Sequence, residues 1–217
     1  MALAWKFKLL KALVVSLCLW AFFWGCEGSG WPPGEGTVER VVDGDTIILH
    51  GGGKVRYLGM DAPEMAREGR PEEFWASEAK EENARLVRNQ KLRLEFDLER
   101  YDQYGRLLAY LFLADGRMVN AELVRRGLAR VYLIPPNLHY QASLVDCQRQ
   151  AIQAQQGLWQ TPTPSDESIY LCNTKSWRFH RPDCPAAKKI TPAHRLSLPN
   201  TLEAYLRGYS PCRNCRP

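Results

Sequence analysis

The chain has 217 residues, of which 45% are hydrophobic and 24% are charged. This balance is typical of a globular protein and excludes a wholly disordered chain. The length leaves room for one full domain and one small one. The formal net charge is +5, but three lysines that contribute to it lie near the start of the chain, at positions 6, 8 and 11. Net charge alone therefore does not indicate nucleic acid as a partner.

The first 26 residues differ in composition from the rest. After the three lysines, residues 12–24 form an uncharged apolar run, shorter than the roughly 20 residues that a membrane-spanning helix needs. This pattern predicts a secretory signal over residues 1–26 and an extracytoplasmic protein. The ending Gly25-Cys26 resembles a bacterial lipoprotein signal, which implies a lipid on Cys26 and contact with a membrane only through this segment. Plain cleavage and an uncleaved anchor are the alternatives.

A Gly/Pro-rich linker is predicted over residues 27–36, and strands follow it. Residues 37–49 predict the first strand region, with a kink between Asp43 and Asp45. Apolar residues on both sides of the three glycines at 51–53 predict a β-hairpin. Because hairpin strands are antiparallel, Asp45 is expected to lie near Asp61 and Glu64.

The rest of the chain mixes short strands with helices. Residues 91–97 alternate polar and apolar side chains, which is typical of a half-buried strand. Further strands are predicted over 106–113 and 128–134, and helices over 71–89, 118–126 and 137–156. The helix over 118–126 is expected to end at Gly127. Strands first and helices interspersed later favour a mainly β (α+β) fold, a small closed barrel with helices packed on it.

The hairpin region gathers three carboxylates and one guanidinium. Asp45, Asp61 and Glu64 supply negative charge, and Arg56 lies between them in the sequence, with Asp43 beside the site. Carboxylate oxygens are ligands for a hard cation, and an arginine fork suits a phosphate. This combination is typical of a site that holds a cation and a phosphate side by side.

Four segments together resemble the thermonuclease, or staphylococcal-nuclease-like, family. They are VDGDT (42–46), RYLGMDAPE (56–64), DQYGRLLAY (102–110) and DGRMVNAELVRRGLARV (115–131), in the family's order. The resemblance extends over residues 37–159. It implies an OB-type five-stranded β-barrel with three helices, and a calcium-dependent phosphodiesterase that acts on DNA and RNA.

The resemblance also implies roles for single residues. Glu64 matches the family's general base, and Arg56 and Arg106 can each offer a bidentate fork to phosphate oxygens. The implied calcium ligands are Asp45, Asp61 and the carbonyl group of Ala62. Two carboxylates make a sparse site, so water and substrate must complete the ~6–8 oxygen ligands that calcium takes.

Two tyrosines are candidates for substrate binding. Tyr104 matches a family position near the substrate, and Tyr132 matches another more loosely. Such rings can stack on bases without reading sequence, which predicts a preference for single strands and little sequence specificity. Packing at the rim of the barrel is the alternative for both rings. The chain is expected to act as a monomer. The alternative function is a nucleic-acid-binding protein on the same barrel without cleavage.

A second module is predicted at the C-terminus. Residues 161–168 form a Pro/Ser-rich linker between a barrel domain at 37–160 and a small domain at 169–217. His180 and Cys184 are spaced H-x3-C, and Cys212 and Cys215 are spaced C-x2-C. Two close pairs of such ligands predict a tetrahedral structural zinc site. The segment resembles the zinc module of the bacterial alkylation-response DNA repair protein.

Other readings of the cysteines stay open. Cys172 is a rival to His180 as the fourth ligand, and disulfides are an alternative to zinc in an exported protein. Cys147 lies on the apolar face of a predicted helix, which indicates a buried free thiol. A short helix is expected over residues 200–206 and should end at Gly208. The module is rich in arginine and lysine, so it either contacts DNA or only caps the chain.

Overall fold

The computed structural model describes residues 34–161 and 169–217. The predicted signal, most of the first linker and nearly all of the second linker therefore lie outside the described residues. Within those two ranges, none of the helices has the length and apolar character needed to cross a bilayer.

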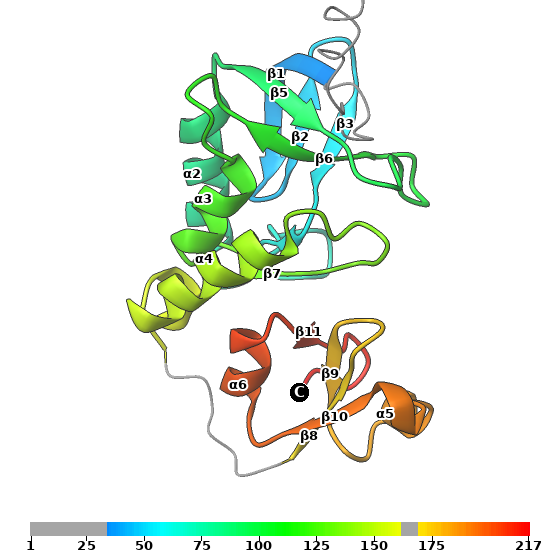
Figure 1. The fold of residues 1–217 in the computed structure, drawn as a ribbon. Coiled ribbons are helices and arrows are strands. Elements are labelled where there is room, and N and C mark those ends of the chain that lie inside the picture. Colours follow the sequence, from blue (N-terminus) through cyan, green and yellow to red (C-terminus); the bar gives the residue numbers. More distant parts are fainter. Residues whose placement is uncertain (1–33, 162–168) are drawn as a thin grey trace, which may run out of the picture. The chain divides into compact units, whose positions relative to one another are not determined.

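Five strands close into a barrel in the order β1-β2-β3-β6-β5 (Figure 1). Antiparallel pairing of the first strand with β5 closes it, and β3 and β6 are parallel. This confirms the predicted barrel. The strands are β1 (Gly34–Asp43), β2 (Thr46–Leu49), β3 (Lys54–Tyr57), β5 (Lys91–Glu95) and β6 (Leu107–Phe112). Because β1 begins at Gly34, the last three residues of the predicted first linker belong to the barrel.

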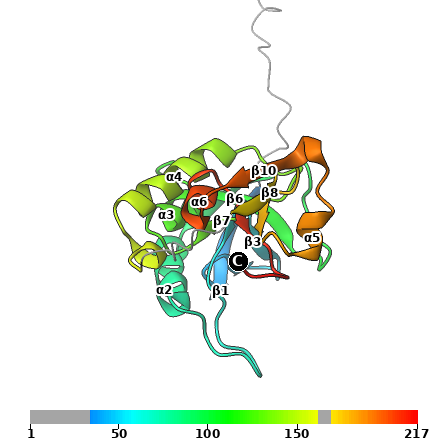
Figure 2. The ribbon, with the colours of Figure 1, turned by 90° about the horizontal axis from the view of Figure 1, so that it is seen from below.

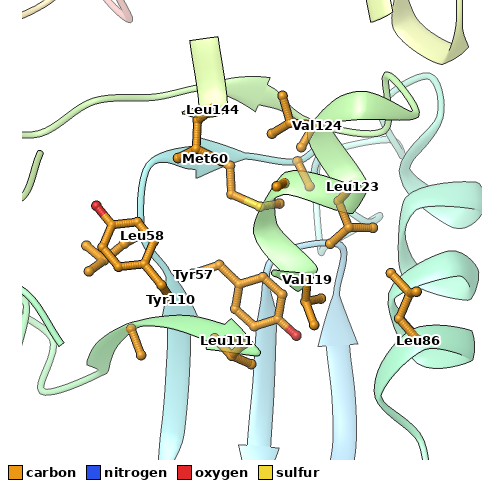
Figure 3. Close-up of a cluster of buried hydrophobic side chains, with 14 of the residues drawn as sticks. Tyr57, Leu58, Met60, Leu86, Tyr110, Leu111, Val119, Leu123, Val124 and Leu144 are labelled. Atoms are coloured by element: carbon orange, nitrogen blue, oxygen red, sulfur yellow. The ribbon is translucent and has the colours of Figure 1, made fainter. Parts of the chain in front are cut away.

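The predicted hairpin is present as β2 and β3. Thr46 pairs with Arg56, and Ile47 with Val55, in antiparallel register. The side chains of Ile47 and Val55 are fully buried, because alternate residues of a strand face the barrel interior. Figure 3 shows the adjoining core, in which side chains from the barrel, from α3 and from α4 meet.

Three helices accompany the barrel in the described part of the chain: α2 (Ala76–Val87), α3 (Val119–Arg125) and α4 (Gln141–Gln153). α2 begins five residues later than predicted, since Trp75 has a positive φ of 71° that interrupts a helix. α4 also begins late, because the Asn137 side chain bonds both the N–H and the carbonyl group of Glu99. α3 gives way to Gly127 at φ +67°, as predicted.

The C-terminal segment builds a four-stranded sheet in the order β10-β8-β9-β11. These strands are β8 (Tyr170–Asn173), β9 (Arg178–His180), β10 (Arg195–Leu198) and β11 (Ser210–Pro211). Two short helices, α5 (Pro185–Lys188) and α6 (Thr201–Leu206), complete it (Figure 2). The predicted helix before Gly208 is thus confirmed, and Asn200 caps it by accepting a hydrogen bond from the N–H of Glu203.

A two-stranded sheet lies beside the barrel, and a buried glutamine connects it to the C-terminal segment. β4 (Met60–Asp61) pairs with β7 (Arg130–Val131), which replaces most of the strand predicted over 128–134. Gln148 of α4 is fully buried and bonds both β7 and α6. Its Oε1 accepts from the N–H of Val131 at 2.7 Å, and its Nε2 donates to the carbonyl of Tyr205 at 2.6 Å. α6 packs against α4, so the segment and the barrel form one compact unit.

The Gln148 contacts predict a stability effect. Gln148→Ala leaves a buried backbone donor and a buried acceptor without partners, which should lower the free energy of unfolding by about 2–4 kcal/mol. Gln153→Ala is the matched control, because Gln153 is an exposed residue of the same helix. Urea unfolding followed by tryptophan fluorescence measures both. Equal midpoints for the two variants would contradict the bridging role.

Candidate active site

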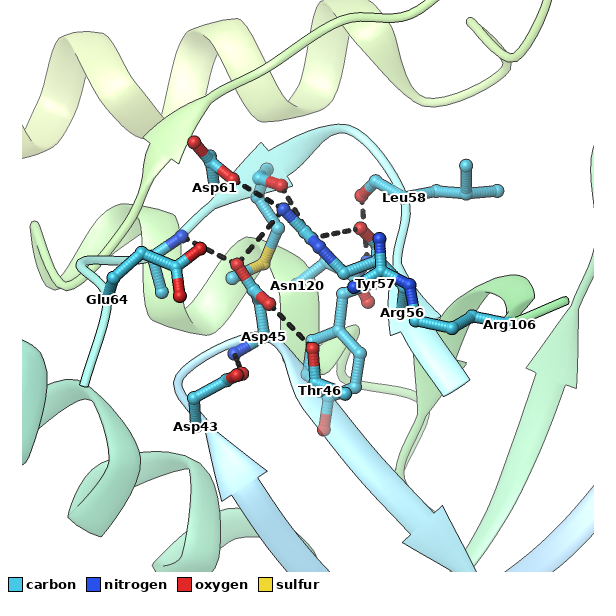
Figure 4. A network of polar contacts seen from close by, with 12 residues as sticks. Asp43, Asp45, Thr46, Arg56, Tyr57, Leu58, Asp61, Glu64, Arg106 and Asn120 are labelled. Carbon is cyan, nitrogen blue, oxygen red and sulfur yellow. Dashed lines mark hydrogen bonds and ion pairs between the residues drawn. The ribbon is translucent and has the colours of Figure 1, made fainter. Parts of the chain in front are cut away.

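The guanidinium of Arg56 lies between two carboxylates at the end of the β2–β3 hairpin (Figure 4). Its Nη2 is 3.1 Å from Oδ2 of Asp45 and 2.5 Å from Oδ1 of Asp61. Its Nη1 donates to the carbonyl groups of Tyr57 and Met60 at 2.8 and 2.9 Å. The structure thus brings Asp45 and Asp61 onto one nitrogen atom, and both outer nitrogens of the arginine fork are bonded to protein groups.

The turn between β1 and β2 holds Asp45 in place. Its Oδ2 accepts from the N–H of Ala62 at 2.8 Å, and its Oδ1 accepts from the hydroxyl of Thr46 at 2.9 Å. Gly44 is needed here, since a Cβ atom at this position would lie 2.6 Å from the Cβ of Ala62 and 2.8 Å from that of Ala79. The carboxylate therefore has a fixed position before any ligand binds.

A buried hydrogen-bond chain supports the same turn from behind. The Tyr57 hydroxyl donates to Oδ1 of Asn83 at 2.8 Å, and Nδ2 of Asn83 donates to the carbonyl of Asp43 at 2.9 Å. Tyr57 and Asn83 are both essentially inaccessible to solvent. The turn is thus fastened to β3 and to α2.

Negative charge accumulates in this site. Burial, together with the charge of Asp45, raises the pKa of Asp43 to about 6. Burial disfavours the charged form of Arg56, but the carboxylates of Asp45, Asp61, Asp43 and Glu64 outweigh it and hold the pKa of Arg56 above its ordinary value. A cluster of carboxylates around one buried arginine suits binding of a further cation.

Glu64 and Arg106 lie at the rim of this cluster. Glu64 follows the β4 strand, its side chain is 55% exposed, and its carboxylate accepts from Nη2 of Arg67 at 2.6 Å. Figure 4 shows this carboxylate directed toward Asp45. Arg106 directly precedes β6, and the parallel register with β3 puts it on the same face as Arg56.

Asp102 positions Arg106 and was not identified from the sequence. Its Oδ1 accepts from the N–H groups of Tyr104 and Arg106, and its Oδ2 accepts from Nε of Arg106 at 2.7 Å. Although burial favours the neutral acid, the hydrogen bonds from Arg106 hold the pKa of Asp102 below its ordinary value. The sequence contained a signal for this turn, because an Asp followed three residues later by a Gly, as at residues 102 and 105, is typical of a β-turn.

The two tyrosines have different surroundings. The Tyr104 side chain is exposed, and the guanidinium of Arg106 lies 5.6 Å from its ring centre. Tyr132 follows β7, and Arg178 of the C-terminal segment lies 3.7 Å above its ring. Arg213 of the same segment lies 5.1 Å from that ring. One ring is therefore open to solvent and the other is covered by guanidinium groups.

The C-terminal segment gathers the four predicted metal ligands. The ligand atoms of His180, Cys184, Cys212 and Cys215 lie within 4.8 Å of one another. Cys172 is instead buried among apolar and aromatic side chains, apart from this cluster. Cys147 has a free, buried thiol, as predicted. The structure therefore selects His180 over Cys172 as the fourth member of the cluster.

The chemistry of this cluster fits a metal ion. Burial lowers the pKa of His180 and favours the neutral ring that binds metals. Burial opposes ionisation of Cys184, but the N–H groups of Ala187 and Ala186 at the start of α5 lower the pKa of its thiol. The described cysteines are free thiols. The neutral ring of His180 and the lowered pKa of Cys184 match ligands of a thiolate and imidazole site.

The barrel, its acidic cluster and the neighbouring arginines define an enzyme of the nuclease class, and comparison with known proteins supports this. Residues 54–161 match the family described as staphylococcal nuclease homologue. The chain belongs to the staphylococcal nuclease family.

Three relatives document this membership. The thermonuclease of Staphylococcus intermedius is 39% identical over 126 residues, which cover 57% of this chain and 74% of the relative. The thermonuclease of Staphylococcus hyicus is 40% identical over 125 residues, or 56% and 73% of the two chains. The endonuclease YncB of Bacillus subtilis is 44% identical over 109 residues, or 48% and 51%.

Proposed function

We propose that this nuclease, a hydrolase of phosphodiester bonds, is calcium-dependent and cleaves DNA and RNA, preferably single-stranded, with little sequence specificity. The nuclease class follows from the family and its thermonuclease and endonuclease members. The observation that carries the finer proposal is the meeting of Asp45 and Asp61 at a single atom of Arg56. A cation-binding pair of carboxylates thus adjoins an arginine fork.

The residues present fit calcium. Asp45 and Asp61 offer hard carboxylate oxygens, and Ala62, whose N–H donates to Asp45, is the residue whose carbonyl we propose as a third ligand. The place between the two carboxylates already holds a positive group, the guanidinium of Arg56, so the local field favours a cation. When bound, calcium supplies positive charge beside the phosphate and neutralises the charge that develops on its oxygens.

The chain's own groups bind the phosphate and move the proton. Arg56 and Arg106 hold the non-bridging oxygens, and Glu64 takes a proton from the attacking water. For Arg56 to do so, it must exchange a carboxylate partner for a phosphate oxygen. Tyr104 and Tyr132 are proposed to contact the substrate strand. The exposed ring of Tyr104 has the open face that stacking on a base requires.

Digestion of single-stranded DNA tests the activity and its metal requirement. We expect cleavage in the presence of calcium and loss of cleavage when a chelator removes it, with recovery after calcium is restored. Cleavage that a chelator leaves unchanged would contradict the calcium site. Binding without cleavage under either condition would instead favour the alternative, a nucleic-acid-binding protein on the same barrel.

Substitutions test the roles of single residues. Glu64→Gln and Arg106→Ala should each slow cleavage at least about tenfold, a barrier change of about 1.4 kcal/mol. Arg117→Ala is the control for Arg106, because Arg117 makes the same pair of bonds to Asp115 that Arg106 makes to Asp102. Glu68→Gln, at an exposed position, is the control for Glu64. A wild-type rate in Glu64→Gln or Arg106→Ala would remove that residue from the mechanism.

We also propose that the cluster of His180, Cys184, Cys212 and Cys215 holds a structural zinc ion. The full-length protein should carry one zinc per chain by elemental analysis, and Cys184→Ala should lose it. Cys172→Ala should keep it, because Cys172 lies in an apolar cluster away from the four ligands. Zinc-free protein whose cysteines do not react with thiol reagents would favour disulfides instead. Loss of zinc from Cys172→Ala but not from Cys184→Ala would show that Cys172, and not Cys184, is a ligand.

The location is proposed from the sequence. The leader of residues 1–26 supports an extracytoplasmic nuclease, either secreted or anchored through a lipid on Cys26, which acts as a monomer. Mass spectrometry of the mature N-terminus distinguishes lipidation, plain cleavage and retention of the leader.

A further inference from the structure

The C-terminal segment places an arginine at the proposed active site. Nη2 of Arg213 is 3.7 Å from Oδ2 of Asp61, whose other oxygen contacts Arg56. The same guanidinium lies 5.1 Å from the ring centre of Tyr132. Arg213 stands between Cys212 and Cys215, two members of the Cys/His cluster. A residue from the loop of the Cys/His cluster thus reaches a carboxylate of the barrel's site.

The backbone that carries Arg213 is firmly held. Cys212 donates its N–H to the carbonyl of Phe179 at 2.9 Å, and its own carbonyl accepts from the N–H of Arg216 at 3.0 Å. The preceding strand β11 pairs with β9. If zinc binds the four ligands, it adds a further constraint on both sides of Arg213.

The segment is also fastened to the strand next to the site. Nη1 of Arg178 donates to the carbonyl of Leu133 at 3.0 Å and to the hydroxyl of Ser210 at 2.7 Å, while its guanidinium covers Tyr132. Gln148 joins β7 to α6 by two buried hydrogen bonds. Since β7 pairs with the strand that bears Asp61, Arg213 is set at a defined place relative to that carboxylate.

The arginines near the site differ in how firmly protein groups bind them. Arg56 is bonded to two carboxylates and two carbonyl groups, and Arg106 is bonded to Asp102. The side chain of Arg213 is 71% exposed, and its ion pair with Asp61 is long. Long exposed pairs are weak, so this guanidinium can turn to another anion at little cost. A nucleic acid that approaches the acidic cluster brings such anions as its backbone phosphates.

We propose that Arg213 is a substrate-binding residue, supplied by the Cys/His module, that holds a backbone phosphate flanking the one to be cleaved. The inference rests on the proposed nuclease function and adds a second role for the module beyond its own stability. An arginine fork binds phosphate oxygens in bidentate fashion, which suits this contact. We assign it the flanking phosphate because Arg213 approaches Asp61, whereas Arg56 and Arg106 are the residues proposed to hold the phosphate that is cleaved.

Salt-dependent binding of single-stranded DNA tests the contact. Fluorescence anisotropy of a labelled oligothymidylate gives Kd over a series of salt concentrations, measured in a Glu64→Gln background with a chelator present so that the probe stays uncleaved. Arg213→Ala should weaken binding about threefold or more at low salt, and the slope of log K against log salt should fall by about 0.7, the loss of one phosphate contact on a single strand. Arg213→Lys should keep most of the slope, since the charge remains.

Lys188→Ala is the matched control. Lys188 is an exposed cation of the same module, on α5, so its removal changes the net charge equally. We expect its slope to equal that of the parent. The same fall in Lys188→Ala would overturn a specific contact and indicate only the overall charge of the module. An unchanged Kd and slope in Arg213→Ala would overturn the proposal directly.

Kinetics with an otherwise unaltered chain separate this inference from the function on which it rests. Arg213→Ala should raise KM for single-stranded DNA about threefold or more and leave kcat within about twofold, as loss of uniform binding does. If the parent chain does not cleave at all, the nuclease proposal fails, and the binding assay still decides whether Arg213 contacts phosphate. If the parent cleaves and the variant has the same KM, only the present inference fails.

Discussion

The contact of one guanidinium with two carboxylates organises the site. Arg56 is largely buried, and a buried cation without partners is costly, so Asp45 and Asp61 must lie close to it. The same arginine binds the carbonyl groups of Tyr57 and Met60, which curves the chain between β3 and β4. The position of Asp61 and the path of the backbone thus depend on a single side chain.

This constraint also explains why the acidic cluster can exist at all. The carboxylates of this cluster would repel one another, and the raised pKa of Asp43 reflects its burial first and then the charge of Asp45. Arg56 offsets part of the charge, and backbone N–H groups and the Thr46 hydroxyl stabilise Asp45. What remains is an excess of negative charge at a fixed place, the property that a calcium site requires.

The C-terminal segment is part of the architecture around the site. It shares a buried cluster with Ala151 and Trp159 of the barrel region, and Arg178 covers a tyrosine next to β7. The module therefore does more than close the end of the chain. Arg213, which lies between two members of the Cys/His cluster in the sequence, brings this segment into contact with Asp61.

The barrel and the grouping of residues were predictable from the sequence, because they depend on local patterns and spacing. Alternating apolar residues around the three glycines set the β2–β3 hairpin, and the antiparallel register then brings Asp45 near Arg56. The spacing of the histidine and cysteine pairs likewise predicted a cluster. The starts of α2 and α4 were predicted too early, since Trp75 has a positive φ and the Asn137 side chain bonds the distant Glu99, which no periodicity reveals.

What the sequence by itself determined is therefore the barrel class, the family and the residue types that can meet. Only the tertiary structure decided that His180 and not Cys172 completes the cluster, that Arg56 is bonded to protein groups on both outer nitrogens, and that Arg213 reaches Asp61. The contact between Arg213 and Asp61 joins segments far apart in the chain, and it depends on the packing of the C-terminal segment against the barrel region, which local patterns do not encode. The Arg56 bonds are local in sequence, but their geometry depends on how the turn after β3 folds back toward Asp45.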